Sequence, residues 1–117
     1  MQTQLLCQGR SCRVSISGRI TIDSAPALRI LLLQYLDSAA SDSLTVDLYA
    51  VPYVDTSCLA VLLEILREAC AQKKALYLTG LRDRPRYLLE ATRILHMFHE
   101  VARDGTAMNA VPASNLQ

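Results

Sequence analysis

The sequence predicts an α/β fold: a single domain in which a mixed, mostly parallel sheet of about four to five strands has helices packed against it. Two observations carry this prediction. The chain has 117 residues, of which 51% are hydrophobic, so its length suits one domain and its composition can supply a core. After an initial hairpin pattern, short extended segments alternate with longer segments of helical periodicity, which is typical of βαβ crossovers.

The first two strands are expected at residues 3–8 and 12–17, with a turn at residues 9–10. In the second segment apolar and polar side chains alternate, as they do in a strand with one buried face. Residues 19–22 then form a short extended connection. The two segments and their turn predict a β-hairpin.

The four cysteines stand at positions 7, 12, 58 and 70, and none of them forms a Cys-x-x-Cys pair. The histidines, His96 and His99, lie far from them in the sequence, so zinc and redox motifs are absent and no metal or cofactor is expected. Cys7 and Cys12 can face each other across the hairpin. We nevertheless interpret both as small, half-buried side chains that stay reduced in the cytosol.

The first helix is expected over residues 25–39. Asp23 and Ser24 are candidate capping residues, and Pro26 suits the first turn of a helix. Five apolar side chains recur at helical spacing and define its buried stripe: Leu28, Leu31, Leu32, Tyr35 and Leu36. A small polar loop follows, up to residue 43.

A short strand is expected at residues 44–48, and Pro52 limits it because proline cannot donate to a ladder. The second long helix is expected to begin at Asp55-Thr56-Ser57. Its buried stripe consists of Leu59, Leu62, Leu63, Leu66 and Cys70. Lys73 and Lys74 place positive charge at its C-terminal end, where they complement the helix dipole.

Three further elements are expected after this helix: a strand at 75–79, a helix over about residues 83–92 and a short element within 94–101. Residues 103–117 are small, polar and weakly patterned. We therefore expect one domain over residues 1–102 and a loosely ordered C-terminal tail.

The charge balance bears on the possible partners. Twelve Lys and Arg residues against eleven Asp and Glu residues give a net charge of +1, so no global field attracts nucleic acid, and no direct binding to it is expected. The N-terminus lacks the pattern of a signal peptide, and the apolar runs are far shorter than the roughly 20 residues that span a bilayer. We expect a cytoplasmic protein without membrane insertion. The known catalytic motifs are also missing, so we expect no enzyme.

Arg82, Arg84 and Arg86 form a basic cluster at the start of the third helix. Such a cluster can bind a phosphate or an acidic partner. The interpretation that we favour is the solvated start of a helix, because clusters of like charges are by themselves weak signals.

The segment from Pro52 to Cys58 is the most informative part of the chain. Read locally, Asp55 or Thr56 is a helix cap. The alternative is a docking surface, because Pro52, Tyr53 and Val54 place three apolar groups in a loop beside hydroxyl groups. A phosphoryl group on Thr56 would lie at a helix N-terminus, which tolerates negative charge, and would repel a docked partner.

At these residues the chain resembles the STAS family, which includes bacterial anti-sigma factor antagonists and domains of sulfate transporters. The resemblance covers most of residues 5–100. It rests on Gly18 with Ser24-Ala25-Pro26-Ala27-Leu28, on Val46-Asp47-Leu48-Tyr49-Ala50-Val51, and on Tyr53-Val54-Asp55-Thr56-Ser57-Cys58-Leu59-Ala60-Val61-Leu62-Leu63. Cys58 stands where the family usually has glycine.

The resemblance implies a non-enzymatic regulator that binds an anti-sigma factor, which is itself a serine/threonine kinase supplied with ATP. Phosphorylation then ends the binding, with Thr56 as the phosphoacceptor and Ser57 as its neighbour. The implied partner-binding residues are Asp23, Pro52, Tyr53, Val54, Asp55, Thr56, Ser57 and Cys58. An alternative implied by the same resemblance is a STAS subunit that docks onto the ATPase of a bacterial lipid ABC transporter.

Overall fold

The computed structural model describes residues 1–38 and 41–103. Its elements are β1 (Gln2–Gln8), β2 (Ser11–Ser17), α1 (Ala25–Asp37), β3 (Ser43–Ala50), α2 (Thr56–Ala71), β4 (Ala75–Thr79), α3 (Asp83–Ala91), the 3-10 helix η1 (Leu95–Met97) and β5 (His99–Val101). The predicted tail lies outside the described residues except for Arg103, so the expected domain boundary stays a prediction.

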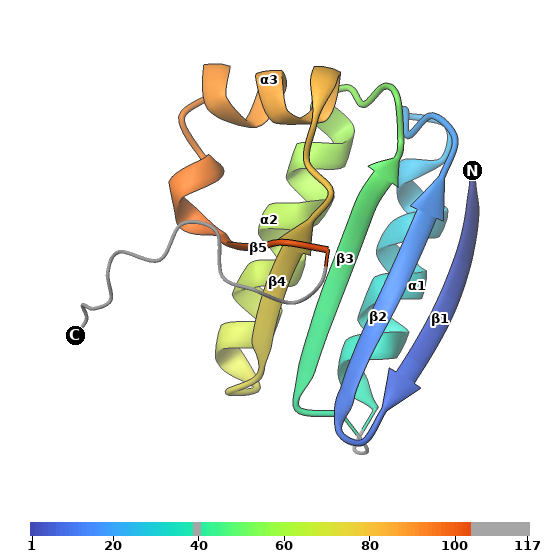
Figure 1. Ribbon diagram of the computed structural model, residues 1–117, viewed down its shortest axis with the longest axis vertical. Helices are drawn as coiled ribbons and strands as arrows, with labels where there is room; N and C mark the ends of the chain where they lie inside the picture. The colour runs from blue at the N-terminus through green and yellow to red at the C-terminus, as the bar shows by residue number, and fades with distance from the viewer. Residues whose placement is uncertain (39–40, 104–117) are drawn as a thin grey trace.

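The five strands form one sheet in the order β1-β2-β3-β4-β5. β1 pairs with β2 in the antiparallel sense, and the other neighbouring strands pair in parallel. Helices α1 and α2 lie side by side behind this sheet, and α3 lies at the end toward which the parallel strands point (Figure 1). The predicted mixed, mostly parallel α/β fold is confirmed.

The core lies between the sheet and the two long helices. Alternate residues of the central strands are buried there: Val14, Ile16, Leu44, Val46, Leu48, Leu76 and Leu78. The helices meet them with buried side chains that include Leu28, Leu32, Leu36, Leu62 and Ile65. Burial of every second strand residue and of one helix stripe accounts for the two periodicities in the sequence.

Gly80, directly after β4, lies close to the backbone of β3. Gly80 has a φ of +72°, and a Cβ atom there would lie 2.6 Å from Asp47 Oδ1 and 2.6 Å from the Tyr49 nitrogen. The Asp47 carboxylate is buried and accepts a hydrogen bond from the Tyr49 amide, at 3.0 Å. Only glycine fits this position without a shift of the backbone.

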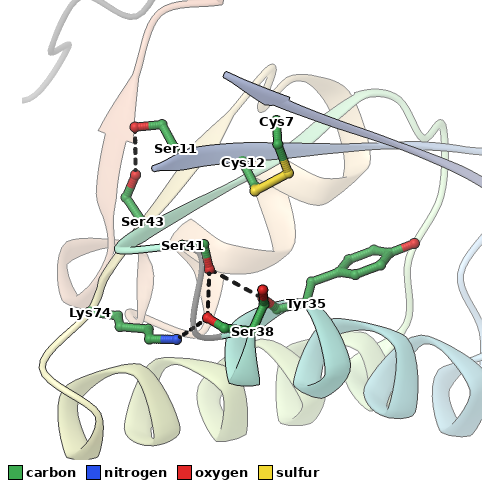
Figure 2. The surroundings of a disulfide bond; sticks show 8 residues. All are labelled: Cys7, Ser11, Cys12, Tyr35, Ser38, Ser41, Ser43 and Lys74. Atoms are coloured by element: carbon green, nitrogen blue, oxygen red, sulfur yellow. Dashed lines mark hydrogen bonds between the residues drawn. A yellow bond between two sulfur atoms is a disulfide. The ribbon is translucent and has the colours of Figure 1, made fainter. Parts of the chain in front are cut away.

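The hairpin end of the molecule carries a disulfide bond (Figure 2). Cys7 and Cys12 are partners in the register of β1 and β2, with their Cα atoms 4.0 Å apart, and their sulfur atoms are bonded. The expectation that both cysteines stay reduced is therefore wrong. Directly opposed positions place the side chains on the same face of the hairpin, so the two thiols meet as soon as the strands pair.

Lys74 was expected to complement the dipole of the second long helix, α2, but it contacts α1 instead. Helix α2 ends at Ala71, and the Lys74 ammonium instead donates to the carbonyl oxygens of Leu36 and Ser38 at the end of α1. Figure 2 shows the bond to Ser38. The charge thus satisfies carbonyl groups of the neighbouring helix that lack intrahelical partners.

Candidate functional site

Two chain segments meet at the carboxyl end of the sheet. Ile20, before α1, forms a parallel bridge with Val54, which precedes α2. The Ile20 amide donates to the Tyr53 carbonyl at 3.0 Å, and the Asp55 amide donates to the Ile20 carbonyl at 3.2 Å. These bonds bring the predicted partner-binding residue Asp23 into the same region as residues 52–57. We call residues 20–23 and 52–57 together the carboxyl edge.

Asp55 holds the two segments and the start of α2 in one hydrogen-bond network. As the N-cap residue it accepts hydrogen bonds from the Ser57 amide, at 3.0 Å, and from the Ser57 hydroxyl. Its other carboxylate oxygen accepts the Ile22 amide at 2.9 Å. The Ser57 hydroxyl is the main cause that lowers the pKa of Asp55, and the Ile22 and Ser57 amides add to it. The capping role suggested by the sequence is confirmed for Asp55.

The two candidate phosphoacceptors have different environments. Thr56 is the first residue of α2 and is exposed, and within residues 1–38 and 41–103 its hydroxyl has no hydrogen-bond partner. Ser57 is half-buried, and its hydroxyl is occupied by Asp55. The hydroxyl that an enzyme can reach at this helix start is that of Thr56.

Val54 and Cys58 lie inside the core, each with 1% of its surface exposed. The expectation that Pro52, Tyr53 and Val54 all lie at the surface is therefore wrong for Val54, because its bridge to Ile20 turns the side chain inward. Burial, with a smaller effect of Asp55, raises the pKa of the Cys58 thiol to about 12. Neither side chain can contact a partner docked on the folded domain.

The remaining predicted residues of the carboxyl edge are accessible. Pro52 and Asp23 are exposed, and Tyr53 is half-buried beneath the Arg19 guanidinium, which lies 4.6 Å from the centre of its ring. Ile22 is 70% exposed directly beside Asp55, and sequence reasoning missed it. An apolar residue in a predicted extended connection gave no signal of its exposure, because the turn that precedes α1 rotates it outward.

The described residues contain no group of three or more His, Cys, Asp and Glu side chains close enough to hold a metal ion. None of the helices in that part of the chain has the length and apolar character needed to cross a membrane. The carboxyl edge presents a capped helix start, the exposed hydroxyl of Thr56 and exposed apolar groups.

Residues 4–99 match a protein family described as "Mlab, STAS domain". The chain belongs to the STAS domain family. The resemblance noted in the sequence is thereby confirmed. No curated protein matches this STAS domain by sequence.

Solved structures share its fold at low sequence identity. An anti-sigma factor antagonist from Mycobacterium paratuberculosis has a TM-score of 0.75 and 21% identity, over 85% of this chain and 83% of that chain. The Bacillus cell fate determinant SpoIIAA in its phosphorylated form has a TM-score of 0.68 and 12% identity, over 97% and 100%. A sulfate transporter family protein from Wolinella succinogenes has a TM-score of 0.62 and 19% identity, over 73% and 68%.

Proposed function

We propose that this STAS domain is an anti-sigma factor antagonist. In this role it binds, through the carboxyl edge, an anti-sigma factor that is also a serine/threonine kinase, and phosphorylation at Thr56 ends the binding. The fold that it shares with an anti-sigma factor antagonist and with phosphorylated SpoIIAA supports the role. The domain acts as a binding module in the cytoplasm and catalyses nothing itself.

The observation that carries this proposal is the difference between Thr56 and Ser57. A kinase needs a hydroxyl that enters its active site, and Thr56 is exposed at the first position of α2. Ser57 would first have to give up its hydrogen bond to Asp55. The same network fixes the backbone at the helix start, which carries Thr56.

A phosphoryl group on Thr56 would change the edge without unfolding it. It adds about −1.5 to −2 charges. The free amides and the dipole at the start of α2 stabilise this charge within the domain. For a partner the effect is opposite, because the phosphate adds its charge to the negative charge already present on Asp55 and must be desolvated when the interface closes.

The surface around Thr56 offers apolar area for docking. Pro26 and Ile30 lie four residues apart on α1 and are both exposed, as are Thr56 and Ala60 on α2. Arg29 and Glu64 join the two helices at this surface, with an Arg29 Nε to Glu64 Oε1 distance of 2.8 Å. Together with Ile22, these groups supply an apolar surface with a polar rim, which suits a protein interface.

Phosphorylation can be tested by incubating the domain with a kinase-type anti-sigma factor and ATP, followed by intact mass spectrometry. We expect one added phosphate on the wild type and on Ser57→Ala, and none on Thr56→Ala. Circular dichroism of each variant checks that the fold is kept. Phosphate on Ser57 alone would overturn the assignment of Thr56.

A second candidate function is that of a STAS subunit docked onto the ATPase of a bacterial lipid ABC transporter. The fold shared with a sulfate transporter family protein supports a transport role. In this case the same edge contacts the ATPase and Thr56 carries no phosphate. Stable co-purification with a transporter ATPase from the native cell, with an unmodified Thr56 in the complex, distinguishes this function from the first.

A further inference from the structure

Six arginine and tyrosine side chains gather where α3 and the loop after β2 meet the carboxyl end of the sheet. They are Arg19, Tyr49, Tyr53, Arg82, Arg84 and Tyr87, and we call them the Arg–Tyr surface. The sequence showed only part of it, as the basic cluster at the start of α3. The fold removes Arg86 from this cluster, because Arg86 pairs with Glu90 and with the buried Glu100, and it brings in Arg19 from a distant part of the chain.

Each of the three arginines lies over a tyrosine ring. Arg19 and Arg84 share the ring of Tyr53, with guanidinium carbons 4.6 Å and 5.5 Å from its centre. Arg84 also lies 5.7 Å from the centre of the Tyr87 ring. A guanidinium that lies over a ring keeps its edge, and therefore its N–H donors, free for another group.

Arg82 extends the surface toward β3. Its guanidinium carbon lies 4.0 Å from the centre of the Tyr49 ring, and its Nε donates to the Tyr49 carbonyl at 3.0 Å. The guanidinium carbon of Arg103 lies 4.3 Å from the centre of the same ring, but Arg103 forms an ion pair with Asp47. Of the two cations on Tyr49, Arg82 is thus the one that leaves terminal donors available.

The charges of Arg19, Arg82 and Arg84 are not neutralised within the described part of the chain. Five other arginines each have a carboxylate within 4.0 Å: Arg10, Arg13, Arg29, Arg86 and Arg103. The three arginines of the Arg–Tyr surface have none, and Asp83, which stands between two of them in the sequence, forms no ion pair there. Within the same described residues Arg67 and Arg93 also lack such a carboxylate, but neither lies over a tyrosine ring. Arg19, Arg82 and Arg84 are thus the uncompensated arginines that aromatic contacts hold together.

We propose that the Arg–Tyr surface binds an acidic segment of a protein partner, with carboxylates bridging its guanidinium groups. Arginine and tyrosine are enriched at protein interfaces because they combine large, stiff contact area with donors. All three arginines are exposed, and Tyr49 and Tyr87 are 42% and 60% exposed, so a chain can lie across the surface. Carboxylates of the partner would neutralise the three arginines, which have no carboxylate partner within the described part of the domain.

Other anionic partners fit less well. Nucleic acid and anionic membranes are held by many phosphate contacts, and this domain offers three free arginines in one group. A small anion needs donors that converge on one point, whereas these guanidinium groups stack on rings of three tyrosines that come from separate elements. A polypeptide with spaced carboxylates matches the spread of charge.

The surface shares Tyr53 with the carboxyl edge, but its binding requires neither Thr56 nor phosphorylation. The test uses the full ¹⁵N-labelled chain and a ten-residue glutamate peptide, followed by NMR at low salt. We expect chemical-shift changes at the Nε–H groups of Arg19, Arg82 and Arg84, and a loss of affinity of at least about tenfold between 20 and 200 mM salt.

Arg19→Gln/Arg84→Gln should weaken binding at least about fivefold, whereas Arg67→Gln/Arg93→Gln, which removes the same charge elsewhere, should not. Equal weakening by both pairs would overturn the proposal, as would no binding, or tighter binding of decathymidylate or of vesicles with anionic lipid. Thr56→Ala should bind the peptide like the wild type. A failure of the peptide test therefore does not bear on the phosphorylation of Thr56, which the kinase experiment tests separately.

Discussion

The cysteines show how the environment of a single residue decides its chemistry. Cys58 is buried with a thiol pKa raised to about 12, and Cys7 and Cys12 are joined. Cys70 is exposed and free, so its expected place in the buried stripe of the second helix is wrong. At pH 8 Cys58 is therefore held in its thiol form. Reactivity toward alkylating reagents should follow these three environments.

Iodoacetamide should modify one thiol, Cys70, in the native oxidised protein at pH 8. After mild reduction, Cys7 and Cys12 should also react, because they lie at the exposed end of the hairpin. Cys58 should react only on unfolding. Peptide mass spectrometry reads these stages, and modification of Cys58 as fast as Cys70 in the folded protein would contradict its burial.

The carboxylate of Asp55 should contribute stability that depends on pH. Its pKa is lowered in the folded state, so its contribution is present above the unfolded value of about 3.9 and is lost as the pH falls through the folded value. Asp55→Asn should therefore lower Tm at pH 7, and the difference from wild type should shrink below about pH 4.

The matched control for this measurement is Asp23→Asn. It removes the same charge at the same edge, from a carboxylate with no hydrogen bond or ion pair within the described residues, and should leave Tm at pH 7 unchanged. A loss for Asp55→Asn that is as large at pH 3 as at pH 7 would show that the charge of Asp55 does not matter.

Single residues also mark the limit of prediction from the sequence. A cap at Asp55 or Thr56 followed from local rules, because a helix start needs a side-chain acceptor, and the structure assigns it to Asp55. Val54 and Ile22 did not, because both are apolar residues in irregular segments. The bridge between Ile20 and Val54, a contact distant in sequence, determines which of the two turns inward.

At the level of elements, two glycines with positive φ allow two costs of a Cβ atom to be distinguished: the strain of a left-handed backbone and a collision with neighbouring atoms. Gly9 in the hairpin turn has a φ of +62°, and a Cβ atom would meet nothing within 4 Å. Gly80 has a similar φ, but a Cβ atom would collide with Asp47 and Tyr49. The two positions thus share the backbone strain and differ in the collision.

Gly9→Ala should lower the free energy of unfolding by about 1 kcal/mol, the cost of a left-handed backbone for a residue with a Cβ atom. Gly80→Ala should cost about 2 to 3 kcal/mol, since the junction of β3 and β4 must also shift. Urea denaturation of both variants measures the difference. Equal losses would show that the junction gives way at no cost.

The disulfide should matter little to the element that carries it. It closes a loop across five residues of sequence, so an entropic estimate of its contribution is about 2 kcal/mol. The Cys7→Ser/Cys12→Ser variant should fold and lose no more than that amount in urea denaturation. Failure of this variant to fold would mean that the edge hairpin depends on the bond.

For the whole molecule, the order of elements and the sheet could be predicted because each element carries its own periodicity, as in the alternate burial of Val14 and Ile16. The Arg–Tyr surface could not, because Arg19 and Arg84 meet over Tyr53 only after folding. The contact of Lys74 with α1, rather than with its own helix, could not be predicted for the same reason. Local pattern determines elements, and contacts between elements determine surfaces.

The central claim is that the carboxyl edge around Thr56 is a docking surface that a negative charge switches off. Calorimetry with a kinase-type anti-sigma factor tests it most directly, with Thr56→Glu as the variant and Gln8→Glu as its control. Gln8 is the last residue of β1 and lies at the opposite end of the sheet from Thr56, so the control adds the same charge away from the carboxyl edge. Thr56→Glu should weaken binding at least about tenfold and Gln8→Glu should leave it unchanged. Binding of Thr56→Glu as tight as that of the wild type, or an equal loss in both variants, would contradict the claim.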